Sequence, residues 1–309
     1  MVSPDLSVEL GPLRLKNPVL AASGTFGYGA EFLPYFDLGA IGGFVTKGLS
    51  PAPRRGNPPP RIVETPAGML NTIGLQNVGV DAFVREKLPG LRAYDTAVIA
   101  NVFGETDAEY VEVCAKLDQV EGVHAVELNV SCPNVDDGGM IYGTDPGALE
   151  RVTRACRRAT RLPLIVKLSP NVTDIRVTAR AAAEGGADIL SLVNTFVGMA
   201  VDVERRQPVL TKVSGGLSGP AIRPLAVWMT WQVRQAVPLP LIGIGGILEA
   251  PDAIEFLLVG ASAVQVGTAN FVHPDAAVRV VRGIEAYLVR HEIPAARDLV
   301  GTLGTGLGP

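Results

Sequence analysis

Lysine and asparagine residues stand directly after short apolar runs of this chain, where they can meet a bound ligand. The residues that end eight such runs are, in chain order, Ser23–Gly24, Lys47–Gly48, Asn101, Asn129, Lys167, Asn194–Thr195, Gly245–Gly246 and Gly267–Thr268. Buried lysine and asparagine side chains need polar partners, because an unpaired buried charge is very costly. If these residues converge, they predict a site for a polar ligand.

The last two positions in that series are glycine turns. Glycine lets the backbone approach an anion closely, and N–H groups near helix starts bind phosphate. In α/β barrels a phosphate site commonly follows the seventh and eighth strands. The turns therefore predict a phosphate-bearing cofactor or substrate. The glycine-rich stretch Gly24–Gly29 does not match the dinucleotide fingerprint, so we expect no NAD site in this chain.

A cysteine loop follows Asn129 and holds Ser131, Cys132, Pro133 and Asn134. A thiol acts as a base when its surroundings favour the thiolate. Cys114 and Cys156 fall at apolar-periodic positions of expected helices, which predicts core packing. The cysteines show no C-x-x-C spacing and the chain has only three histidines, so we expect no metal or iron–sulfur site.

The eight apolar runs predict the elements that position these residues. They are Pro18–Ala22, Gly43–Thr46, Ala97–Ala100, Ala125–Leu128, Leu164–Val166, Ile189–Val193, Leu241–Ile244 and Ala263–Val266. Continuous apolar runs are typical of parallel strands buried on both faces. Helix-start signals between them, at Thr106, Asp145–Pro146, Asp174 and Pro251–Asp252, indicate alternating strands and helices. The sequence therefore predicts a single (β/α)8 TIM-barrel domain over residues 1–309.

Segments outside the simple barrel repeat are expected at both ends of the barrel. Leu6–Leu15 reads as a hairpin turning at Gly11–Pro12, which could cover the barrel bottom. Long insertions are expected after strands 2, 4 and 6, including residues 48–94 and 195–237. Long connections within a compact barrel usually serve function.

Composition excludes several classes of protein. Hydrophobic residues make up 47% of the 309 residues, and the net charge is −4. A nucleic-acid-binding surface would need a basic patch or stripe. No apolar run approaches the roughly 18 residues of a membrane span, and Met1–Pro18 does not read as a signal peptide. We expect a cytoplasmic protein.

Five motifs together resemble the dihydroorotate dehydrogenases over nearly the whole chain. They are Asn129-Val-Ser-Cys-Pro-Asn134, Asn71-Thr-Ile-Gly-Leu75, Lys167-Leu-Ser-Pro-Asn171, Gly215-Gly-Leu-Ser-Gly219 and Gly243-Ile-Gly-Gly246. A cysteine at position 132 resembles class 1 of the family, since class 2 carries serine there. Arg55–Arg61 and Gly68–Asn77 resemble class 1B, which passes electrons to NAD.

The resemblance implies an FMN cofactor and a role for each candidate residue. Cys132 is the implied catalytic base. The implied substrate residues are Lys47, Asn71, Thr72, Ile73, Gly74, Leu75, Asn129, Asn134, Asn194 and Thr195. The implied FMN residues are Ser23, Lys47, Gly48, Asn101, Asn129, Lys167 and Val193 for the ring, and Gly219, Gly245, Gly246, Gly267 and Thr268 for the phosphate tail.

The reaction implied by the resemblance is oxidation of (S)-dihydroorotate to orotate in de novo pyrimidine biosynthesis. The thiol of Cys132 would remove a proton while the flavin takes a hydride. The implied assembly is a homodimer of this chain, and a heterotetramer with an electron-transfer subunit that carries FAD and a 2Fe–2S cluster.

Other functions are also compatible with the residues. A class 1A enzyme would use fumarate as its oxidant. A related flavin barrel would act on dihydropyrimidines that lack the carboxylate. A Schiff-base aldolase would use Lys47 or Lys167 and need no flavin. A barrel kept only as a scaffold subunit would bind no cofactor.

Overall fold

Eight parallel strands close into a barrel in the computed structural model, which describes residues 3–130 and 142–304. Around the barrel the strands follow chain order, and each pairs in parallel with its neighbours. They are β3 (Val19–Ala21), β4 (Gly43–Val45), β7 (Ala97–Val102), β8 (Ala125–Asn129), β9 (Leu164–Lys167), β10 (Ile189–Leu192), β15 (Leu241–Ile244) and β16 (Ala263–Val266). The predicted (β/α)8 barrel is confirmed, and each predicted run overlaps one strand, although β7, β8 and β9 extend one or two residues beyond their runs.

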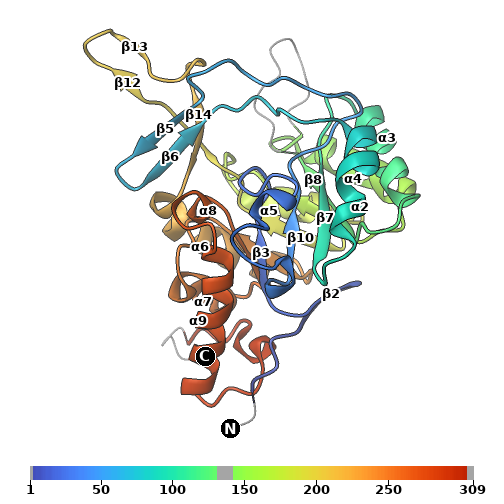
Figure 1. Cartoon of the computed structure of the whole chain (residues 1–309), viewed down its shortest axis with the longest axis vertical. Helices are drawn as coiled ribbons and strands as arrows, with labels where there is room; N and C mark the ends of the chain where they lie inside the picture. Colours follow the sequence, from blue (N-terminus) through green and yellow to red (C-terminus); the bar gives the residue numbers. More distant parts are fainter. Residues whose placement is uncertain (1–2, 131–141, 305–309) are drawn as a thin grey trace.

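Helices surround the barrel, as Figure 1 shows for the right-hand and lower sides. The longer ones are α3 (Asp107–Asp118), α4 (Pro146–Ala159), α5 (Ile175–Glu184), α6 (Arg223–Ala236), α7 (Ala250–Leu258) and α9 (Ala276–Arg290). A helical stretch after β6 runs through α1 (Val80–Ala82), a π-helical turn at Phe83–Lys87 and α2 (Leu88–Leu91), and α8 (Ala269–Val272) follows β16.

Side-chain caps start several of these helices where the sequence predicts them. The Asp145 carboxylate accepts the N–H of Ala148 at 2.8 Å, and Asp174 accepts that of Arg176 at 3.0 Å. The Thr106 hydroxyl accepts the N–H of Glu109. The Glu109 carboxylate accepts from Glu105 rather than from Thr106, so only half of a capping box forms there. Such caps satisfy N–H groups that have no partner within the helix.

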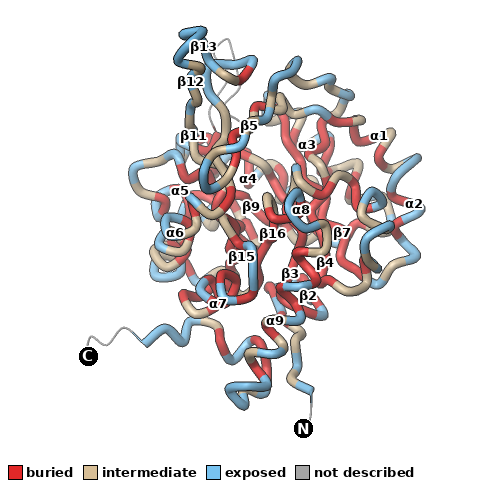
Figure 2. Tube along the Cα trace, turned by 60° about the vertical axis from the view of Figure 1, so that its left-hand side comes forward, coloured by how far each residue is buried: buried red, intermediate tan, exposed pale blue. Residues whose placement is uncertain are grey.

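The hydrophobic core occupies the barrel strands and the inner faces of the helices. Figure 2 shows the strands as an almost continuous buried region with exposed residues on the outside. Cys114 on α3 and Cys156 on α4 are fully buried in this core, as predicted.

A hairpin of β1 (Val8–Leu10) and β2 (Leu13–Leu15) lies at the N-terminal end of the barrel. A Cβ placed on Gly11 would lie 3.8 Å from the backbone oxygen of Asp188, one residue before β10 begins. The leucines at both ends of the turn, Leu10 and Leu13, are buried. The hairpin therefore covers the barrel bottom, opposite the end where the strands finish.

The insertions after β4 and β10 pair with each other above the barrel. The first contributes β5 (Ile62–Thr65) and β6 (Gly68–Asn71), and the second β11 (Phe196–Gly198) and β14 (Gly215–Ser218). They form one antiparallel sheet in the order β11-β14-β6-β5, in which Asn71 lies opposite Gly216. The sheet lies over the C-terminal ends of the barrel strands.

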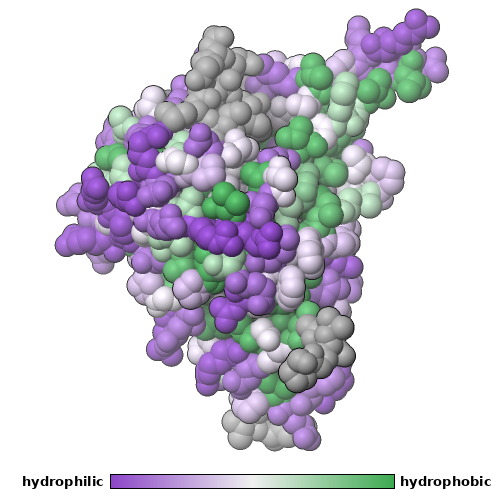
Figure 3. Space-filling view, turned by 180° about the vertical axis from the view of Figure 1, so that it is seen from behind, coloured by the Kyte–Doolittle hydropathy of each residue, from purple (hydrophilic) through white to green (hydrophobic). Residues whose placement is uncertain are grey.

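A second hairpin projects from the insertion after β10 (Figure 1). It consists of β12 (Val201–Asp202) and β13 (Gln207–Pro208). Apolar side chains on and near it are exposed, namely Val197, Met199, Val201, Val203 and Val213. We call these five residues the apolar arm, and Figure 3 shows apolar surface on and below the hairpin. Within residues 3–130 and 142–304, no helix is both long and apolar enough to cross a membrane.

Candidate active site

A cavity of about 510 Å³ opens at the C-terminal end of the barrel, beneath the sheet formed by the two insertions. Every predicted site residue that the structure describes lines it: Ser23, Lys47, Gly48, Asn71, Thr72, Ile73, Gly74, Leu75, Asn101, Asn129, Lys167, Val193, Asn194, Thr195, Gly219, Gly245, Gly246, Gly267 and Thr268. Cys132 and Asn134 lie outside the described residues. The structure thus brings together residues that are separated by almost the whole chain, while the role of each stays a prediction.

Asparagine side chains on one wall of the cavity bond to one another. The Asn194 Nδ2 donates to Asn129 Oδ1 at 3.1 Å, and Asn194 Oδ1 accepts the N–H of Thr195 at 2.8 Å. These bonds fix the orientation of both side-chain amides. They determine which nitrogen and oxygen atoms bond to a neighbour and which remain for a ligand. The wall therefore offers oriented donors and acceptors of the kind that the edge of a pyrimidine ring can match.

The loop after β6 is held by Asn57, to which the sequence assigned no role. The Asn57 Nδ2 donates to the carbonyl oxygen of Thr72 at 2.9 Å. Gly74 has φ 73°, and a Cβ there would lie 2.6 Å from the Asn57 backbone nitrogen. The motif Arg55–Arg61 contains Asn57, but the sequence alone does not indicate which backbone group its side chain holds. It fixes the backbone of residues 72–75 at the cavity wall.

Asn171 is a second residue missed by sequence reasoning, although it ends one of the quoted motifs. It lines the cavity. Its Nδ2 donates to the carbonyl oxygen of Thr195 at 3.0 Å, and its Oδ1 accepts the N–H of Val197 at 2.9 Å. Asn171 thus fixes the chain where it leaves β10 and enters β11.

Glycines form a cradle at the opposite end of the cavity. Gly219, Gly245 and Gly246 have φ of 93°, 134° and 74°, a region that other residues rarely adopt. A Cβ on Gly246 would lie 2.9 Å from the carbonyl oxygen of Gly219. The Thr268 hydroxyl donates to the Ser218 hydroxyl at 2.8 Å. Bare backbone and hydroxyls at the ends of β15 and β16 suit a phosphate group.

Two lysines supply positive charge to the cavity. Lys167 at the end of β9 is 6% exposed. Lys47 follows β4, and burial, together with the nearby charge of Arg61, lowers the pKa of its ammonium group. Both effects disfavour the cation in the free protein, so an anionic ligand beside Lys47 would stabilise its charged form.

A buried polar layer lies directly beneath the cavity and was not predicted. Glu127 on β8 is fully buried, two residues before Asn129. Its carboxylate accepts hydrogen bonds from Asn101 Nδ2, Ser191 Oγ and Gln265 Nε2, at 2.8, 2.9 and 2.9 Å. One charged residue within the apolar run Ala125–Leu128 was the signal that could have revealed this layer.

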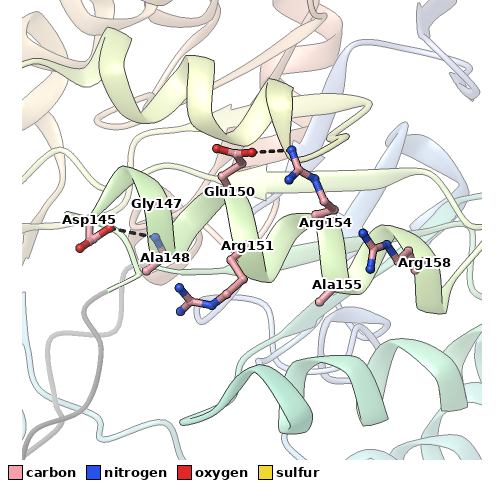
Figure 4. Close-up of a pocket in the computed structure, with 8 residues that line it drawn as sticks. All are labelled: Asp145, Gly147, Ala148, Glu150, Arg151, Arg154, Ala155 and Arg158. Carbon is pink, nitrogen blue, oxygen red and sulfur yellow. Dashed lines mark hydrogen bonds and ion pairs between the residues drawn. The ribbon is translucent and has the colours of Figure 1, made fainter.

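A second hollow, of about 550 Å³, lies outside the barrel along α4 (Figure 4). Arginines line it, but Arg151 pairs with Asp107 and Arg154 pairs with Glu150. None of its lining residues is among the predicted site residues. We interpret it as a solvated, charged helix face.

Comparison with known proteins gives concordant matches. The sequence model of the family described as dihydroorotate dehydrogenase matches residues 5–288. A protein of Citrifermentans bemidjiense is 58% identical over 303 residues, covering 98% of this chain and 99% of its own. A protein of Trichlorobacter lovleyi is 59% identical over 302 residues, with the same coverage. Both are named dihydroorotate dehydrogenase B (NAD(+)), catalytic subunit.

Proposed function

The chain belongs to the dihydroorotate dehydrogenase family, and on that basis we propose that it oxidises (S)-dihydroorotate to orotate in pyrimidine biosynthesis. It is an FMN-dependent oxidoreductase, as members of this family are. The observation that carries the proposal is the cavity at the strand ends, which collects every described candidate residue.

The residues of the cavity fit a flavin mononucleotide. Gly219, Gly245 and Gly246 line the cavity with positive φ angles, so bare backbone stands there and a phosphate could approach it closely. The buried Asn101 Oδ1 has no hydrogen-bond partner within the described residues, so it is an acceptor that an N–H group of the flavin could satisfy. When bound, FMN supplies a hydride acceptor. Lys167 and Lys47 line the same cavity, and their positive charge would stabilise an electron-rich reduced ring.

The substrate would bind against the amide wall and the loop after β6. The side chains of Asn71, Asn129 and Asn194 supply donors and acceptors for the pyrimidine edge. The backbone of residues 73–75 would supply N–H groups for the carboxylate, next to the Thr72 carbonyl that Asn57 holds. Lys47 lies on the same cavity and would complement the negative charge.

Cys132 would take the proton that leaves the substrate carbon. Its thiolate form is the base, and a positioned base typically contributes about 10²–10⁴-fold to a rate. Asn129 starts the motif that contains it, and the Tyr110 hydroxyl donates to the Asn129 carbonyl at 2.8 Å. The described part of the motif is therefore held by α3.

Electrons would leave through a partner subunit that carries FAD and a 2Fe–2S cluster and passes them to NAD. The printed names of the relatives support this, because each is called a catalytic subunit of an NAD-linked enzyme. We also propose a homodimer within a heterotetramer. The apolar arm supports an interface, because contiguous exposed apolar side chains commonly mark protein contacts. We expect the assembly to work in the cytoplasm, as the sequence predicts.

An anaerobic titration tests the proposal. Dihydroorotate should bleach the purified yellow protein, and neither NAD nor fumarate should reoxidise it without the partner. Reoxidation by fumarate would assign the chain to class 1A. A colourless protein that cannot be reconstituted with FMN, but is trapped by borohydride with its substrate, would favour a Schiff-base lysine instead.

A further inference from the structure

A fully buried carboxylate beneath the cavity has no place in the reaction proposed above. Glu127 Oε1 accepts from Asn101 Nδ2, and Oε2 accepts from both Ser191 Oγ and Gln265 Nε2. The four residues belong to β8, β7, β10 and β16, so the carboxylate links four strands of the barrel. Replacing buried ionic groups by apolar ones is often neutral or stabilising. A buried glutamate here therefore needs a reason beyond stability.

One partner of Glu127, the Asn101 amide, also lines the cavity. The Asn101 NH2 group donates to Glu127 Oε1 at 2.8 Å, which leaves the other end of the amide, Oδ1, turned away from the carboxylate. The backbone of Asn101 is fixed independently, since its N–H donates to Thr46 Oγ1 at 3.2 Å and its carbonyl accepts from Leu49 at 2.8 Å. Rotation of the side-chain amide is the remaining freedom, and Glu127 removes it.

The oxygen left by this orientation lies beside another residue of the cavity wall. Asn101 lines the cavity, and its Oδ1 is buried without a partner among the described residues. A Cβ on Gly48, another cavity residue, would lie 3.0 Å from Oδ1, so the oxygen lies against the bare backbone there. A buried acceptor left unpaired is unfavourable until a donor arrives.

We propose that Glu127 is a positioning residue that holds the Asn101 amide with its oxygen toward the cavity, where it accepts a hydrogen bond from a ring N–H of the bound flavin. The inference rests on the proposed FMN site. The pyrimidine part of a flavin ring carries an N–H donor, so an oxygen is complementary to it. A flipped amide would present NH2 to N–H and would oppose binding.

Glu127→Gln tests the proposal, because it keeps the shape of the side chain and gives the Asn101 amide a donor to turn toward. Flavin affinity is measured by titrating the flavin-stripped full chain with FMN. We expect the Kd for FMN to rise about tenfold, the equivalent of one hydrogen bond. Ser191→Ala is the matched control, since it removes one hydrogen bond to the same carboxylate without affecting Asn101. The control should stay within about twofold of the original affinity.

A paired exchange separates positioning from simple structural support. In the double variant Glu127→Gln with Asn101→Asp, the new amide donates to the new carboxylate, whose second oxygen faces the cavity. We expect this pair to recover flavin affinity to within about threefold of the unaltered chain. A purely structural role predicts no rescue. The proposal would be overturned if Glu127→Gln and Ser191→Ala lost FMN affinity equally. It would also be overturned if a folded double variant did not recover that affinity.

The unaltered holoprotein gives a check that does not depend on any variant folding. A neutron structure distinguishes the two ends of an asparagine amide, which X-ray data at ordinary resolution do not. We expect both deuterons of Asn101 on the atom that faces Glu127. Deuterons on the atom that faces the flavin would sink the idea. An unaltered chain that binds no FMN would instead refute the proposed function, so the two failures are distinguishable.

Discussion

The hydroxyl of Tyr110 donates a hydrogen bond of 2.8 Å to the carbonyl oxygen of Asn129, at the residue where β8 ends. Tyr110 lies on α3 and is 1% exposed. Its ring also packs edge-on against Tyr142, with centroids 5.4 Å apart. A buried helix side chain thus fixes the backbone of a residue that lines the cavity.

Tyr110→Phe should therefore weaken substrate binding more than it weakens the fold. The ring keeps its packing, and loss of one hydrogen bond costs about 1 kcal/mol of unfolding free energy. We expect KM for dihydroorotate to rise several-fold with little change in flavin content, measured by steady-state kinetics. Tyr287→Phe on α9 is the control. Equal kinetics in both variants would show that the bond to Asn129 has no bearing on the site.

Asn57→Ala should loosen the loop that we assign to the substrate carboxylate. The variant removes the donor to the Thr72 carbonyl, which lies at the start of that loop. We expect a rise in KM of roughly tenfold, the equivalent of one hydrogen bond, with flavin retained. Orotate binding by titration calorimetry measures it directly. Unchanged affinity for orotate together with loss of flavin would move residues 72–75 out of the substrate site.

Gly246→Ala should release the cofactor. At φ 74° a side chain is strained, at a cost of about 1–3 kcal/mol, and its Cβ would lie 2.7 Å from that of Arg223. We expect a purified protein with much less flavin, measured by the ratio of visible to ultraviolet absorbance. Gly90→Ala is the matched control, because a Cβ there meets nothing within 4 Å. Full flavin content in Gly246→Ala would place the phosphate elsewhere.

Orotate binding should weaken as pH rises through the lowered pKa of Lys47. Burial and Arg61 hold this pKa below 10.5 in the free protein, and a bound anion raises it again. At a pH between the pKa of Lys47 in the free protein and its higher pKa in the complex, Lys47 is neutral before binding and protonated after it. Binding of orotate therefore takes up a proton, and the affinity falls as the pH rises. Calorimetry in buffers of different ionisation heat measures that uptake. Lys47→Met should abolish it, and identical uptake in the variant would assign the proton to another group.

Cys132→Ser should lower turnover by about 10²–10⁴-fold at neutral pH, because a serine hydroxyl is a far poorer base than a thiolate. Flavin content should not change, since the thiol is assigned to the substrate. Cys156→Ala removes a buried thiol on α4 and should keep its turnover, at some cost in stability. Near-full activity of Cys132→Ser at neutral pH would end the assignment of this thiol as the base.

The barrel strands were predictable from the sequence because parallel strands buried on both faces consist of unbroken apolar runs. Helix starts were predictable wherever an aspartate or threonine supplies a cap, as at Asp145 and Asp174. The chemistry of each strand end followed from the rule that barrel sites lie at the carboxyl ends of the strands.

The sheet formed by the two insertions could not be predicted in this way. The sequences of β6 and β14, Gly-Met-Leu-Asn and Gly-Gly-Leu-Ser, have neither β-branched residues nor a clear polar alternation. Their pairing depends on contacts between segments about 145 residues apart, as between Asn71 and Gly216. Asn57 and Asn171 were missed for the same reason, because they act on backbone groups that only the fold brings near.

The pairing of β6 with β14 also sets how this site can change. Met69 lies opposite Ser218 and Asn71 opposite Gly216, so one short ladder joins the assigned substrate end of the cavity to its glycine cradle. Successive side chains of a strand point to opposite faces, so a shift of one residue reverses all of them. A one-residue shift of β6 along this ladder would therefore turn Asn71 to the opposite face of the sheet. For anyone grafting this pocket onto another barrel, the two insertions are one inseparable part.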